Sequence, residues 1–115
     1  MDSTYLKTET AGPALIATPL TEKVAERESN VIQNEVLAAA PAHQWKVAMD
    51  AGQIQLLASV GLGMLVSINR ECKAKGGKFV VFNISPDLMS VLYVTKLEKV
   101  VAIANDRAAA LKLLS

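Results

Sequence analysis

The stretch that decides the fold of this chain is Leu56-Leu57-Ala58-Ser59-Val60-Gly61-Leu62-Gly63-Met64-Leu65-Val66. A predicted strand ends near Met49-Asp50, a short loop follows, and a serine stands where a long apolar-faced helix begins. A hydroxyl at that place lies over the first helical turn, where unpaired backbone N–H groups and the positive end of the helix dipole are found. Ser59 can therefore cap the helix, or carry a phosphate that the helix would tolerate.

The composition predicts one globular domain over residues 1–115, because 51% of the residues are apolar and 20% are charged. Lys plus Arg (12) nearly balances Asp plus Glu (11), which gives a net charge of +1. The basic residues are scattered along the chain and only 4% of the residues are aromatic. We therefore expect no nucleic-acid partner.

The apolar runs are interrupted by charge and are shorter than the roughly 20 residues that a membrane-spanning helix needs. We therefore expect no membrane insertion. Residues 1–5 lack the basic-then-apolar pattern of a signal peptide. The single cysteine, Cys72, forms no internal disulfide and fits a reducing compartment. Together these features predict a soluble cytoplasmic protein.

Outward from the central stretch, segments with strand and helix patterns alternate. Predicted strands cover residues 5–10, 14–18, 45–49, 78–84 and 100–104, and predicted helices cover residues 24–40, 60–75, 85–95 and 106–114. The order β-β-α-β-α-β-α-β-α indicates an α/β fold in which about five strands form a mostly parallel sheet with an N-terminal hairpin, beside about four helices.

Turn and capping residues mark where these elements end. Gly12-Pro13 predicts the hairpin turn, and Gly76-Gly77 predicts the end of the helix that follows Ser59. Ser85 before Pro86 predicts a helix N-terminus, and Asp106 predicts the cap of the last helix.

The motifs of several enzyme and cofactor classes are incomplete. Gly61-Leu62-Gly63 has Val66 at the third glycine position of a dinucleotide fingerprint, and Gly76-Gly77-Lys78 leads into a strand instead of a helix. His43 is the only histidine and stands in a predicted loop, and Cys72 falls on an apolar helix face. We therefore expect no catalysis, metal site or cofactor.

Three positions around the helix start are ambiguous on the residues alone. Asp50 suits a turn former at the end of a strand. Leu62 and Met64 suit the core, with one of them left exposed as a docking contact.

The chain resembles the STAS domain family, and within it the bacterial anti-sigma-factor antagonists. The family's pattern of a strand ending in Asp-Leu-Ser is matched by residues 47–52, and its Asp-Ser-Ser-Gly-Leu-Gly run by residues 57–63. Gly76-Gly77 before a strand and Ser85-Pro86 before a helix are in register with the same pattern. The match is good over residues 45–114 and covers the first forty residues in outline.

This resemblance implies a regulatory role. Such proteins bind an anti-sigma factor that is also a Ser/Thr kinase of the GHKL fold. The kinase phosphorylates the serine at the helix start and so ends the complex, and a phosphatase reverses the modification. Ser59 falls at that position, so the resemblance implies that it is the phosphorylated serine. The partner-binding surface implied by the resemblance comprises Asp50, Ala58, Ser59, Val60, Gly61, Leu62 and Met64.

The chain departs from the family pattern at four positions. Ala58 and Val60 replace the Asp and the second Ser that flank the family's serine. Ala25 corresponds to an acidic residue near the first helix, and Lys96 replaces a glycine after the third helix, where a positive φ is expected. Two other functions therefore remain open: an unswitched STAS scaffold or complex subunit, of a stressosome or lipid-transport kind, and a small-ligand carrier with a pocket at the strand ends beside Gly61.

Overall fold

A five-stranded mixed sheet with strand order β1-β2-β4-β6-β7 forms the centre of the structure. The structure is a computed structural model that describes residues 5–115; residues 1–4, which the signal-peptide expectation concerned, lie outside the described part. The strands are β1 (Leu6–Ala11), β2 (Ala14–Pro19), β4 (Lys46–Asp50), β6 (Lys78–Phe82) and β7 (Ala102–Ala104). β1 and β2 are antiparallel, whereas β2, β4, β6 and β7 pair in parallel. This confirms the expected mostly parallel sheet with an N-terminal hairpin.

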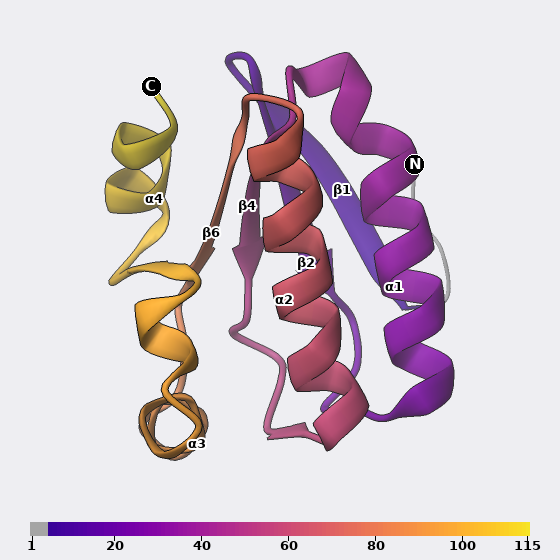
Figure 1. The fold of residues 1–115 in the computed structure, drawn as a ribbon, viewed down its shortest axis with the longest axis vertical. Coiled ribbons are helices and arrows are strands. Elements are labelled where there is room, and N and C mark those ends of the chain that lie inside the picture. Colours follow the sequence, from indigo (N-terminus) through magenta and orange to yellow (C-terminus); the bar gives the residue numbers. More distant parts are fainter. Residues whose placement is uncertain (1–4) are drawn as a thin grey trace.

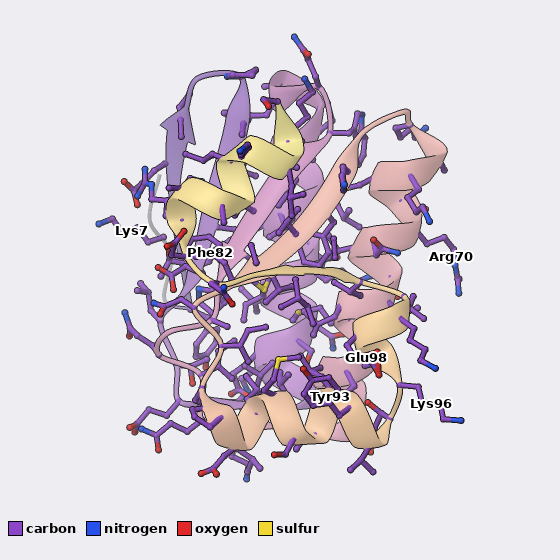
Figure 2. The ribbon with its side chains drawn as sticks, turned by 90° about the vertical axis from the view of Figure 1, so that its left-hand side faces the viewer. Lys7, Arg70, Phe82, Tyr93, Lys96 and Glu98 are labelled. Carbon is purple, nitrogen blue, oxygen red and sulfur yellow. The ribbon has the colours of Figure 1, made fainter. Side chains whose placement is uncertain are left out.

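Helices cover both faces of this sheet (Figure 1). They are α1 (Glu26–Ala39), α2 (Ser59–Ala74), α3 (Pro86–Val94) and α4 (Arg107–Leu114), with short 3-10 turns η1 (Ala40–His43) and η2 (Leu97–Lys99). The alternation of side chains along the strands divides the core in two. The larger cluster lies under α1 and α2, and includes Val47, Met49 and Phe79. The smaller one includes Ala48, Val80 and Phe82, and lies under α4 (Figure 2).

A second, two-stranded sheet was not predicted. It pairs β3 (Lys23–Val24) with β5 (Leu56–Leu57) in parallel. Because Val24 belongs to β3, α1 begins at Glu26 and not at Val24 as predicted. Strands of two residues show no hydrophobic periodicity, so only the tertiary pairing defines them.

The predicted end of α2 and the predicted N-terminal caps of α3 and α4 are confirmed. Gly76 follows α2 with a φ of +82°. The Ser85 side chain accepts a hydrogen bond from the Leu88 amide at 3.2 Å, and Asp106 accepts one from the Ala109 amide at 2.9 Å. Lys96 has a φ of 62°, the positive value that the sequence analysis expected there.

Two predicted strands are shorter in the structure. β6 ends at Phe82, because Asn83 adopts a φ of 61° and leaves the extended conformation. β7 begins at Ala102, because the amides of Val100 and Val101 both bond to the Leu97 carbonyl and close the η2 turn. Within residues 5–115, no helix is both long and apolar enough to cross a lipid bilayer.

Candidate functional site

Ser59 is the first residue of α2, and the helix N-cap is Ala58. This corrects the expectation that the Ser59 hydroxyl caps the helix. Ala58 has the extended backbone of an N-cap, with φ −72° and ψ 170°, but its methyl side chain makes no capping hydrogen bond. Ser59 is exposed, so its hydroxyl lies at the surface over the first turn of α2.

The first turn of α2 offers backbone donors close to that hydroxyl. The amides of Gly61 and Leu62 both bond to the Ala58 carbonyl, at 2.8 and 3.1 Å. The amides of Ser59 and Val60 precede them at positions where a helix has no carbonyl of its own to offer. Together with the dipole of a 16-residue helix, these donors give the surface around Ser59 a partial positive charge.

Two exposed apolar side chains flank Ser59. Leu56, three residues before Ser59, is 54% exposed, and Val60, the residue after it, is 47% exposed. Val60 was expected at the surface, whereas Leu56 was missed, because it belongs to the unpredicted strand β5. The signal available in the sequence was a large apolar residue, Leu56, three positions before the predicted functional serine.

The other predicted contact residues divide between surface and core. Met64 is 1% exposed and belongs to the core, which corrects the expectation that its side chain contacts a partner. Gly61 is buried, and Leu62 is half-buried against the larger core cluster. The outer surface therefore consists of Ser59, Val60 and Leu56, with Ala58 and Leu62 partly accessible.

Backbone contacts with β3 fix the position of this surface. The Ala58 amide bonds to the Val24 carbonyl at 3.0 Å, and the Leu56 amide bonds to the Glu22 carbonyl at 2.9 Å. A Cβ atom on Gly61 would lie 2.9 Å from the Val24 oxygen, so the first turn of α2 packs directly on the β3 backbone. The start of α2 is therefore held by the segment that leads into α1.

Asp50, the last residue of β4, holds the other end of the loop that leads to α2. Its carboxylate accepts hydrogen bonds from the Gly52 amide at 2.9 Å and from Asn83 Nδ2 at 3.1 Å. Asn83 follows β6, so this contact joins the loop that leads to α2 with the loop that leads to α3. The turn-forming role expected for Asp50 is confirmed, and Asn83 is a residue that the sequence analysis did not select.

The cysteine and the histidine of the chain lie away from this site. Cys72 is fully buried, and burial, with a smaller contribution from the charge of Glu71, raises the pKa of its thiol to about 11. It therefore stays a neutral thiol at physiological pH. His43 is in η1, at the end of the domain remote from the first turn of α2 (Figure 1). Among residues 5–115, no group of three or more His, Cys, Asp or Glu side chains is arranged to hold a metal ion.

Comparisons with known proteins agree with this fold. A sequence model of the STAS domain matches residues 10–110. A search of curated protein sequences finds no significant match. Among solved structures, an anti-sigma-factor antagonist (STAS) domain protein from Planctomyces limnophilus is similar, with a TM-score of 0.83 and 22% identity, over 96% of this chain and 97% of that one.

Two further structures show the same fold at low identity. An anti-sigma factor antagonist from Mycobacterium paratuberculosis has a TM-score of 0.82 and 16% identity, over 95% of this chain and 92% of that one. The phosphorylated form of SpoIIAA, a cell fate determinant of Bacillus, has a TM-score of 0.70 and 16% identity, over 94% of this chain and 98% of that one.

Proposed function

The chain belongs to the STAS domain family, and we propose that it is an anti-sigma-factor antagonist that binds an anti-sigma factor of the GHKL-kinase type and is switched by phosphorylation of Ser59. In this proposal the unmodified protein binds the kinase through the first turn of α2 and so releases a sigma factor. Phosphorylation by the bound kinase ends the complex, and a phosphatase restores it.

The observation that carries the proposal is the exposure of Ser59 at the first position of α2, with the exposed residues Leu56 and Val60 before and after it in the sequence. A kinase can reach a hydroxyl at this place without unfolding any part of the domain. The structural relatives support the same reading, since one of them is described as a phosphorylated protein.

The electrostatics of the site account for a switch of this kind. A phosphate brings about −1.5 to −2 charges at neutral pH. The donors and dipole at the start of α2 tolerate that charge in the free protein. In a complex, a partner packed on Leu56 and Val60 would remove water from the phosphate without supplying counter-charges, and the cost of burying the charge favours dissociation. Association is thereby controlled by a local charge, while the fold is unchanged.

A second function is favoured by two residues of the chain itself. Ala58 and Val60 replace the polar residues that flank the serine in the family, which fits a STAS scaffold or complex subunit that is never phosphorylated.

The small-ligand carrier has less support. The apolar void at the strand ends, lined by Met49, Ile54 and Leu88 among others, measures about 10 Å³, which is about the space of one water molecule.

Intact-mass spectrometry after incubation with ATP and the GHKL-type kinase encoded nearest to its gene tests the proposal, with the Ser59→Ala variant as the control. The expected result is a gain of one phosphate in the wild type and none in the variant. Kinase binding without phosphate transfer would overturn the switch and leave a constitutive antagonist. Neither binding nor phosphate would favour the scaffold.

The Ser59→Asp variant tests the consequence for binding. Its affinity for the kinase should fall by at least about tenfold, which corresponds to about 1.4 kcal/mol. Its thermal midpoint should change little, because a carboxylate in the first turn of a helix is tolerated. Stable co-purification with a partner that is not a kinase, unaffected by this substitution, would support the scaffold instead.

A further inference from the structure

The end of the domain opposite Ser59 collects lysines from separate elements. In Figure 1 the β1–β2 turn, the α2–β6 turn and the C-terminal end of α4 lie together at the top, whereas the first turn of α2 and α3 lie at the bottom. The 16 residues of α2 correspond to a separation of about 24 Å. This end is therefore a separate surface from the one around Ser59.

Two lysines stand side by side at this end. Lys46 and Lys78 are direct partners in the parallel register of β4 and β6. Ala48 and Val80, two residues further along the same strands, belong to the core under α4. Because side chains alternate along a strand, Lys46 and Lys78 point to the α4 face as well.

An apolar groove lies at the same end of the domain. It has a volume of about 310 Å³, between the β1–β2 turn and the last turn of α4, and its lining includes Ala11, Pro13, Ala14, Leu111 and Leu114. Leu15 pairs with Val47, so the preceding residues, Ala14 and Lys46, are neighbours across β2 and β4. Ala14, in the lining of the groove, therefore lies next to Lys46, whose neighbour on β6 is Lys78. Lys112 is a third lysine, in the last turn of α4.

Among residues 5–115, neither Lys46 nor Lys78 forms an ion pair. The one ion pair among residues 5–115 joins Arg107 to Glu9, near the other end of α4. Lys75 lies over the Trp45 ring, with Nζ 5.9 Å from its centroid, and adds another cation close to the strand that carries Lys46. Like charges on neighbouring strands disfavour folding. An anionic group from outside the domain would offset the repulsion between Lys46 and Lys78.

We infer that this end is a second docking site, which binds an acidic protein segment carrying one bulky apolar side chain. The apolar side chain fills the groove between the β1–β2 turn and α4, and carboxylates of the segment lie against Lys46 and Lys78. The recessed groove selects an inserted side chain over a flat lipid surface, and the lysines select an acidic segment over a basic one. The domain can then hold two partners at once, one at each end.

Fluorescence anisotropy tests the inference with a fluorescein-labelled peptide in which one phenylalanine is flanked on both sides by glutamates. The peptide should bind saturably to the wild-type protein and more weakly at high salt. The same peptide with alanine in place of phenylalanine should bind at least about tenfold more weakly. If both peptides bind equally, or neither binds, the groove is not a docking site.

Matched charge variants complete the test. The double variant Lys46→Glu, Lys78→Glu should lose at least about tenfold in affinity. If this charge reversal impairs folding, Lys46→Gln, Lys78→Gln replaces it, and a smaller loss of affinity is expected there because the charges are removed but not reversed. Lys96→Glu, Lys99→Glu changes the net charge equally, on the α3–η2 side where Lys96 projects outward (Figure 2), and should bind normally. An equal loss in both glutamate double variants would overturn the inference, as would binding to phosphatidylserine vesicles without binding to the peptide.

Discussion

A Cβ atom built on Gly61 would lie 2.9 Å from the backbone carbonyl oxygen of Val24. The same oxygen accepts the hydrogen bond of the Ala58 amide at 3.0 Å, so it cannot retreat without loosening the start of α2. The first turn of α2 therefore rests on the backbone of β3, and a residue without a side chain is required at this contact. The helix that presents Ser59 is positioned by this close approach.

Gly61→Ala should lower the free energy of unfolding by about 1–3 kcal/mol, because the added methyl group overpacks a contact with backbone atoms. Gly63→Ala is the matched control on the same helix. A Cβ atom on Gly63 meets nothing within 4 Å, so this variant should be as stable as the wild type or more stable by about 0.5–1 kcal/mol. Urea denaturation followed by circular dichroism measures both. Equal stability of the two variants would contradict the close contact.

Ala58→Asp should raise the free energy of unfolding by about 1 kcal/mol, because α2 has an N-cap backbone at Ala58 but no side-chain oxygen to accept a hydrogen bond. Ser59→Ala should leave stability nearly unchanged, since Ser59 is not the cap. Thermal and urea denaturation of the two variants distinguish these positions. A clear loss of stability in Ser59→Ala, without a gain in Ala58→Asp, would place the cap at Ser59.

Lys96→Gly should stabilise the protein by up to about 1 kcal/mol, because Lys96 adopts a φ of 62° that is strained for any residue with a Cβ. The greater flexibility of glycine in the unfolded chain offsets part of this gain. Lys99→Gly, in the following η2 turn, lacks the strain and should destabilise by about 0.5–1 kcal/mol. Differential scanning calorimetry compares the two midpoints. A lower midpoint for Lys96→Gly would argue that its backbone is unstrained in solution.

The stability of the protein should fall as the pH rises from 9 to 11. Burial, followed by the charge of Glu71, raises the pKa of the Cys72 thiol from 9.0 to about 11 in the native state. Between these values the native thiol keeps a proton that the unfolded thiol has lost, so alkali favours unfolding. Below pH 9 the contribution of the Cys72 thiol to the free energy of unfolding is fully present.

Cys72→Ala provides the reference for this measurement, because it lacks the titrating group. The difference in unfolding free energy between the wild type and this variant should decrease steadily from pH 9 to pH 11 in urea denaturation. A difference that stays constant over this range would mean that the Cys72 thiol titrates normally. The comparison also cancels the titration of lysines and tyrosines, which both proteins share.

Much of the fold was predictable because its signals are local. Gly76 ends α2 through a positive φ, and Ser85 and Asp106 cap their helices with side-chain oxygens. Each of these depends on a few neighbouring residues. The positive φ at Lys96 was predictable in the same way, because the backbone there keeps a glycine-like conformation although the residue is a lysine.

The candidate site was predictable in position but not in composition. Ser59 lies at the start of α2 as expected, whereas Met64 points into the core and Leu56 is exposed. The rotation of α2 about its axis decides which side chains face outward, and the packing of the helix on the sheet and on β3 sets that rotation. Short strands such as β3 and β5 arise only from that packing.

The sequence by itself determined the order of the five main strands and the four helices, the end of α2, the N-terminal caps of α3 and α4, and the place of Ser59, because caps, turns and periodicity act over a few residues. The tertiary structure alone decided that Ala58 takes the N-cap position of α2, that Gly61 must approach Val24, that Asp50 bonds to Asn83, and that Lys46 meets Lys78. These contacts join residues distant in the chain. Their free energy depends on how strands register and helices pack, which local patterns do not encode.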